Sequence, residues 1–193
     1  ADGTRNTRPW QNDPAAAGRT SVEVPWVGMY SAISSASDVL KAIRISKTVI
    51  NNAADTKRAE TVAQLMLGAG LSYIALNYDK GYIVDETVDL SSLTYSNRKL
   101  IRDAAVAKLL DAAAMAKANA FTTKPEWTNG VSYSSVQIAH IANTRAASTL
   151  GEYPRKAAEK AAAHGPQRLT SEERGRHSGR AGASVVACEG VRG

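Results

Sequence analysis

The side chains that most often carry out catalysis are few in this sequence and far apart along it. The histidines are His140, His164 and His177, and the single cysteine is Cys188. A catalytic site needs a nucleophile, a base and a group that orients the base. The histidines lack metal-ligand spacing, and Cys188 has no evident activating partner. We therefore expect a protein that is not an enzyme, with His140 as a hydrogen-bonded structural histidine, and a lone cysteine excludes an intramolecular disulfide framework.

Four acidic residues cluster between two expected helices, and carboxylate oxygens are the ligands that Ca²⁺ prefers. These residues are Asp79, Asp85, Glu86 and Asp89. Their spacing does not match an EF-hand, whose loop also needs a glycine at its sixth position. We interpret them as surface carboxylates and expect no metal ion and no cofactor.

Aromatic residues at helix ends and in loops are the most suggestive binding feature. They are Tyr78, Tyr82, Tyr95, Trp127, Tyr133 and Tyr153, and Trp10 precedes the first helix. Exposed rings at such positions can anchor a protein partner or stack on sugars, whereas buried ones simply pack against helix ends. Both interpretations remain open. We predict that Trp10, Tyr82, Tyr95 and Trp127 form the partner-binding surface.

The elements that position these residues are predicted to be helices. Alanine, the best helix former, accounts for 34 of the 193 residues, and only 6% of residues are aromatic. Apolar residues recur at spacings of three and four, which predicts four main helices and a short fifth one. Their expected ranges are 25–49, 56–78, 97–119, 135–150 and 154–163. We expect an all-α fold of two antiparallel, tetratricopeptide-like hairpins, organised as an extended arm (1–25), a helical core (26–164) and an irregular basic tail (165–193).

Local signals refine these helices and the loops between them. Asp55 and Ser96 are expected N-caps, Ser134 and Gln137 match a capping box, and Gly151 is an expected helix stop. The second stripe comprises Val62, Leu65, Met66, Ala69, Tyr73 and Leu76. Two glycines interrupt that helix, Gly68 and Gly70, and we predict that a neighbouring helix approaches closely there. Loops are expected over 79–95 and 121–130, with a turn at Asn129-Gly130.

The net charge of +6 and the pI near 9.5 favour contact with acidic surfaces. The basic residues are scattered, with no helix face that combines them with aromatics, so we do not expect nucleic-acid binding. No stretch approaches 18 consecutive apolar residues, which predicts a chain that does not span a bilayer.

Four stretches resemble SusD/RagB-type proteins, which are helical, tetratricopeptide-like, extracytoplasmic nutrient-binding lipoproteins. They are PWVGMYSAISSASDVLKAI (25–43), AETVAQLMLGAGLSYIALNYDKGYIVDE (59–86), RDAAVAKLLDAAAMA followed by PEWTNG (102–130), and NTRAASTLGEYPRKAAEKAA (143–162). The likeness ends near Ala162, and members of that family are usually more than twice as long. We therefore expect a truncated core of this type.

The resemblance implies a periplasmic or outer-membrane-associated protein that is peripheral to the membrane. Our first hypothesis is a non-catalytic scaffold or accessory subunit, docked by its loops and arms on the extracytoplasmic face of a larger membrane protein complex, such as a photosynthetic or respiratory assembly. The alternative is a glycan-binding component of an outer-membrane uptake system, whose partner would be an oligosaccharide.

Overall fold

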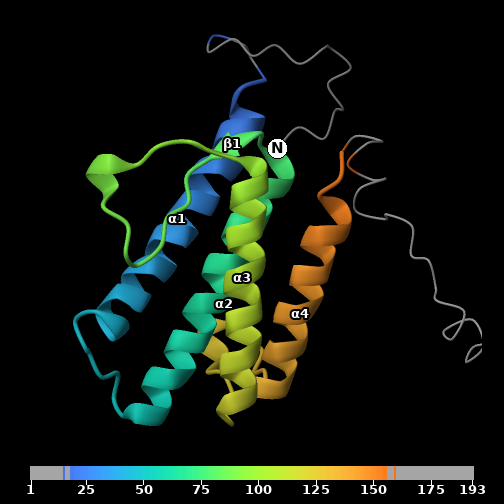
Figure 1. Cartoon of the computed structure of the whole chain (residues 1–193). Coiled ribbons are helices and arrows are strands. Elements are labelled where there is room, and N and C mark those ends of the chain that lie inside the picture. Colours follow the sequence, from blue (N-terminus) through green and yellow to red (C-terminus); the bar gives the residue numbers. More distant parts are fainter. Residues whose placement is uncertain (1–14, 16–17, 156–158, 160–193) are drawn as a thin grey trace, which may run out of the picture. The chain divides into compact units, whose positions relative to one another are not determined.

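The computed structural model describes residue 15, residues 18–155 and residue 159, and the helical fold lies in the unit that ends at Tyr153. The four helices are α1 (Thr20–Arg44), α2 (Ala53–Asn77), α3 (Arg98–Ala118) and α4 (Ser135–Glu152). They form two antiparallel hairpins, α1–α2 and α3–α4 (Figure 1). The predicted all-α class is confirmed. The expected fifth helix and the tail fall largely or wholly outside the described residues.

The helix α2 is the centre of the fold. It packs against α1, α3 and α4, and α1 and α4 lie on either side of it (Figure 1). Among the described helices, α2 alone has the length and apolar composition of a membrane span. However, 78% of its apolar window is buried inside the fold, which is the pattern of a core helix.

The connection between α2 and α3 contains short regular elements. Strand β1 (Lys80–Gly81) pairs antiparallel with β2 (Ser96–Asn97) and closes the loop at its base. The 3-10 turn η1 (Leu90–Ser92) lies inside this loop, and η2 (Pro125–Trp127) lies in the second one. Positive φ angles at Asn129 and Gly130 confirm the predicted turn.

The first helix is displaced from its predicted position at both ends. It begins at Thr20, so residues 20–25, which we expected in the extended arm, are helical. Pro25 is tolerated inside it because the missing N–H leaves only the Ser21 carbonyl unpaired, and Ser21 is exposed to water. The helix ends at Arg44 because the chain turns soon afterwards through Lys47, whose φ is +58°.

Two of the predicted N-caps are wrong by one or a few residues. Asn52 caps α2 by accepting from the Asp55 N–H at 2.8 Å, which places Asp55 inside the first turn. Asn97 caps α3 by accepting from the Leu100 N–H, although Asn97 is also the last residue of β2 and pairs with Lys80. In both cases a second residue within three positions is also chemically able to cap.

At α4 the capping box of Ser134 and Gln137 is confirmed, with both reciprocal hydrogen bonds present. The predicted stop at Gly151 is wrong, because the helix continues through it to Glu152. A glycine ends a helix when its positive φ is used, and here Gly151 keeps a helical backbone.

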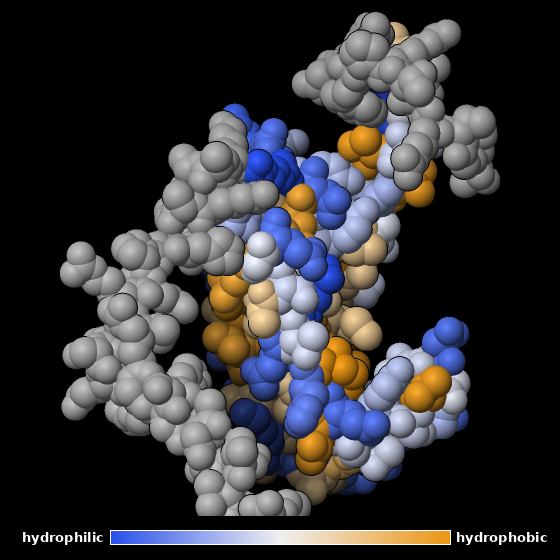
Figure 2. All heavy atoms as spheres, turned by 90° about the vertical axis from the view of Figure 1, so that its right-hand side faces the viewer, coloured by the Kyte–Doolittle hydropathy of each residue, from blue (hydrophilic) through white to orange (hydrophobic). Residues whose placement is uncertain are grey.

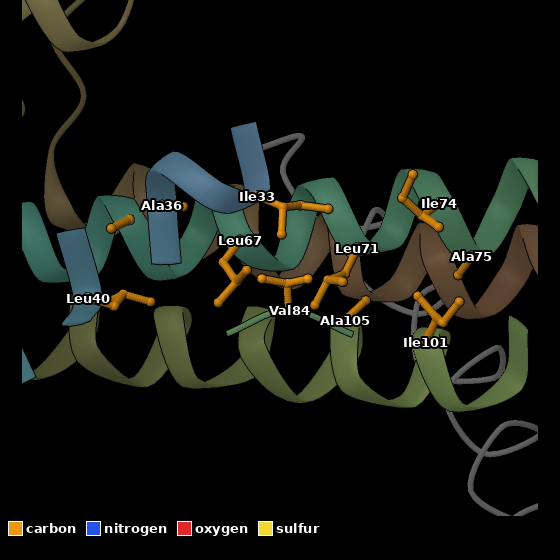
Figure 3. Close-up of a cluster of buried hydrophobic side chains, with 11 residues drawn as sticks. Ile33, Ala36, Leu40, Leu67, Leu71, Ile74, Ala75, Val84, Ile101 and Ala105 are labelled. Atoms are coloured by element: carbon orange, nitrogen blue, oxygen red, sulfur yellow. The ribbon is translucent and has the colours of Figure 1, made fainter. Parts of the chain in front are cut away.

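Two hydrophobic clusters form the core. The first lies where α1, α2, α3 and the α2–α3 loop meet, and Figure 3 shows Val84 of the loop next to Leu67 and Leu71 of α2. The second joins α2, α3 and α4 around Leu109 and a set of alanines. Small alanine side chains allow these helices to lie close together.

The two glycines of α2 mark close helix contacts, as predicted. A Cβ at Gly68 would lie 2.8 Å from Leu109 Cγ and 3.0 Å from its backbone nitrogen on α3. A Cβ at Gly70 would lie 2.6 Å from Ile33 Cγ1 on α1. Both distances are shorter than real Cβ contacts, so α3 and α1 each approach α2 at a position without a side chain.

Candidate functional site

The structure brings together two of the four predicted binding residues. The rings of Tyr82 and Tyr95 stack with centroids 4.3 Å apart and planes 22° apart. Tyr95 is 60% exposed, so one face of this pair is open to solvent. Trp127 lies in η2, on the loop between α3 and α4, and Trp10 lies outside the described residues.

Behind the exposed pair lies a packed aromatic cluster. The Trp26 ring contacts those of Tyr30 and Tyr78 at centroid distances of 4.6 and 4.8 Å. The Tyr30 hydroxyl donates to the Tyr82 carbonyl at 3.0 Å and accepts from the Tyr82 N–H at 2.5 Å. Burial raises the pKa of Tyr30 to about 12. These rings therefore fix the loop against α1, and only Tyr95 is left largely free for a ligand.

Tyr153 also serves packing. It is buried, and the guanidinium groups of Arg98 and Arg102 lie 4.0 and 4.3 Å from its ring centroid. Arg98 also donates to the Tyr153 carbonyl. These contacts tie the start of α3 to the residue that follows α4.

The acidic residues of the first loop are used in ion pairs and caps. The Arg44 guanidinium bridges Glu60 and Glu86, with N–O distances of 2.8 and 2.5 Å. Lys108 pairs with Asp85 at 3.1 Å and with Glu86 at 3.5 Å. The loop is thereby attached to α1, α2 and α3 at once.

Burial alone would raise the pKa values of these carboxyl groups, but their partners have the larger combined effect. Hydrogen bonds from Lys57 and Arg44 hold the pKa of Glu60 below its usual value. A hydrogen bond from Arg44 and the charge of Lys108 do the same for Glu86. Two side-chain hydrogen bonds, from Thr87 and Lys108, contribute to lowering the pKa of Asp85. The three carboxylates are therefore ionised, paired groups of structural character.

The remaining acidic residues of the loop and His140 complete the set of candidate residues in the described part of the chain. Asp89 caps η1 by accepting from the Ser91 N–H, and Asp79 lies beside the strand pair. His140, expected to be a hydrogen-bonded structural histidine, is exposed on α4. Within the described part of the chain, no three His, Cys, Asp or Glu side chains gather as metal ligands.

A groove with a volume of about 720 Å³ is the feature that sequence reasoning missed. Its floor is one face of α2, with walls from α1 on one side and from η2 and α4 on the other. The lining residues are Met29, Ala32, Ser35, Ala36, Val39, Ile50, Ala59, Val62, Ala63, Met66, Ala69, Gly70, Tyr73, Trp127 and Arg145. All except Ser35 and Arg145 are apolar or aromatic.

The groove is open to solvent. Met66 is 44% exposed and Val39 is 37% exposed, although both are large and apolar. Figure 2, which looks onto the side of α4, shows hydrophobic residues at the surface on both sides of a more hydrophilic column. An exposed apolar lining of this kind marks an interaction site in many proteins.

The groove also corrects the interpretation of the second helical stripe. Val62, Met66, Ala69 and Tyr73 were expected to face the core with Leu65, but they line the groove. Of the six residues of this stripe, only Leu65 is buried. The signal that could have revealed this is that α2 is apolar around most of its circumference, more than one core face requires.

An aromatic side chain and a charged side chain stand out in the walls of the groove. Trp127 is half-buried, with the Lys124 ammonium 5.6 Å from its ring centroid. Arg145 projects from α4, and within the described residues no carboxylate pairs with its guanidinium. Of the predicted binding residues that the structure describes, Trp127 is thus the one that belongs to the groove.

The chain has no significant match among protein-family models, curated proteins or solved structures. The geometry of the described residues therefore carries the functional conclusion.

Proposed function

We propose that this protein is a non-catalytic scaffold or accessory subunit that binds another protein through the groove over α2. The observation that carries the proposal is the open apolar lining itself. Burying apolar surface contributes about 25 cal/mol per Å², so an uncovered lining of this size favours association. Trp127 adds an aromatic anchor of the kind that dominates binding energy in protein interfaces.

The setting of this subunit follows from the resemblance to SusD/RagB-type proteins and is part of the proposal. The partners would be subunits of a membrane protein complex on its extracytoplasmic side. The chain would be peripheral to that membrane, because α2, the helix that could span it by composition, has most of its surface in the core. The positive net charge favours an acidic partner surface.

The test is purification of the tagged full chain from native membranes under mild conditions. A photo-crosslinking amino acid at position 39 or 66 should attach to a partner that mass spectrometry identifies. Met66→Glu, which places a charge on the exposed floor of the groove, should abolish the crosslink from position 39 and the co-purification. Val136→Glu is the matched control, because Val136 is 64% exposed on α4 but does not line the groove.

The two variants decide between a specific and a general effect. If Met66→Glu and Val136→Glu co-purify with the same partners as the unmodified chain, the groove is not the docking surface. If Trp127→Ala weakens association without changing helicity, the aromatic wall contributes to it.

One observation favours the alternative, oligosaccharide binding. The stacked pair of Tyr82 and Tyr95 presents an exposed aromatic face, and such faces stack on sugar rings. A glycan array should then show binding that Tyr95→Ala removes. Leu90→Ala is the control, since Leu90 is 66% exposed on the same loop. An array without Tyr95-dependent signals would rule out this alternative.

A further inference from the structure

We propose that the occupant of the groove is an amphipathic α-helix of the partner protein, about four turns long, with an acidic residue placed against Arg145. This inference rests on the proposed function and specifies the chemistry of the partner.

The dimensions of the lining match a helix. On α2 the lining positions run from Ala59 to Tyr73, at spacings of three and four along one continuous face. Fourteen steps of 1.5 Å give a floor about 21 Å long, which is the length of about four helical turns. The α1 wall, from Met29 to Val39, follows the floor for about 15 Å of this length.

The chemistry of the lining favours a helix over an extended strand. An added strand is held by main-chain hydrogen bonds to a sheet edge. Here most of the lining belongs to helices, whose backbone groups are paired within the helix, and the β1–β2 pair is not part of it. Recognition must therefore come from side chains, and a helix that presents apolar residues at spacings of three and four supplies them.

Small residues leave space for such side chains. Ala32 on α1 is exposed and Ala69 on α2 is half-buried, and both line the groove. Because these side chains are small, the groove leaves room beside the exposed Met66 for a large apolar side chain from a partner helix.

The charge of the wall specifies one polar residue of the partner. Arg44 and Arg58 pair with carboxylates, and Arg102 pairs with Asp103. Arg145 differs from them, because its guanidinium has no carboxylate partner within the described part of the chain. A cation beside an apolar lining gains most from an anion that is buried with it, and arginine binds carboxylates in a bidentate geometry.

The experiment uses a display library of random 16-residue peptides, selected on the tagged full chain and counter-selected on the Met66→Glu variant. We expect the enriched peptides to carry apolar residues at spacings of three and four together with an Asp or Glu. Their circular dichroism should become helical on binding. Exchanging the acidic residue for Lys should weaken binding at least about tenfold, and Arg145→Glu should reverse that preference.

Each alternative result overturns the inference in a recognisable way. Enriched peptides that remain extended, or that lose nothing on exchange of the acidic residue, refute the helix or the Arg145 contact. The inference is also refuted if no enriched peptide loses binding to the Met66→Glu variant. If dodecanoate binds saturably and Met66→Glu removes this binding while no helical peptide is enriched, the groove holds an acyl chain. A photo-crosslink at position 66 in native membranes, obtained together with any of these results, keeps the proposed function and rejects only the helix.

Discussion

Substitution of Gly68 tests whether close contact between α2 and α3 organises this fold. The Cβ of Gly68→Ala would stand 2.8 Å from Leu109 Cγ and 3.0 Å from the Leu109 backbone nitrogen. Leu109 is fully buried, so its side chain has no free space into which to move. The backbone nitrogen can yield only if α3 itself shifts away from α2.

The sign of the effect follows from two opposing contributions. Alanine is favoured over glycine in a helix by about 1 kcal/mol, whereas overpacking a core costs about 1–3 kcal/mol. We expect Gly68→Ala to lower the free energy of unfolding by about 1 kcal/mol and Gly68→Leu to lower it by about 3 kcal/mol. For a protein of this size each kcal/mol corresponds to about 2–4 °C in Tm.

Thermal and chemical denaturation followed by circular dichroism measure these changes. Gly28→Ala is the matched control, because a Cβ on Gly28 of α1 meets nothing within 4 Å and should therefore raise Tm. Gly70→Ala should behave like Gly68→Ala, since it meets the buried Ile33. If Gly68→Ala stabilises the protein as much as Gly28→Ala does, the close-contact reasoning is refuted.

Three further substitutions test other parts of the fold. Arg44→Met should lower the free energy of unfolding by about 2 kcal/mol. This is less than the cost of breaking a fully buried ion pair, because the Arg44 side chain is 29% exposed. Denaturant titrations at a series of pH values measure the change. The stability contributed by ionised Glu60 and Glu86 is fully present above their ordinary pKa of 4.5 and is lost as the pH falls through their lowered pKa values. Because Arg44→Met removes a partner of both carboxylates, this loss of stability in acid should be smaller in the variant. An unchanged dependence of stability on pH would contradict the role of the Arg44–Glu60–Glu86 ion pairs. Tyr30→Phe should remove the phenol absorbance titration near pH 12. It should also remove the stability contributed by the neutral Tyr30 hydroxyl, which is fully present below the ordinary pKa of 10 and is lost as the pH rises through about 12. If the titration near pH 12 persists in the variant, it belongs to another tyrosine. Ser134→Ala should cost about 1 kcal/mol through loss of the capping box, whereas Ser148→Ala on the same helix should change stability by less than about 0.5 kcal/mol.

The sequence allowed the helices to be predicted because their signals are local. Alanine content and apolar spacing indicated all four long helices, and the Ser134–Gln137 box fixed the start of α4. The glycines of α2 were correctly interpreted because an interior glycine is costly unless something lies against it. Helix ends were less accurate, since Asn97 and Ser96 are both chemically able to cap a helix and their side chains alone do not decide which one does.

The candidate site was predicted less well because it depends on how helices are arranged. Tyr82 and Tyr95 are thirteen positions apart, and they stack only because the strand pair closes the loop that carries them. Arg145 has no distinguishing sequence context, and its importance follows from lying on a wall of the groove without a carboxylate nearby. No periodicity in a single helix contains that information.

The alanine-rich composition has a consequence beyond helix formation. Where α2 meets α3, small residues face a neighbour and bring the helices together, as with Gly68 against Leu109. Where α1 and α4 stand on either side of α2, residues of the same size such as Ala32 and Ala69 face no neighbour, and the same lack of side-chain volume leaves a hollow. Larger residues at these positions would fill the groove and cover Met66 within the chain itself. Small side chains therefore both close the core and leave an apolar face open, and a partner helix with large side chains is the occupant that we propose for this face.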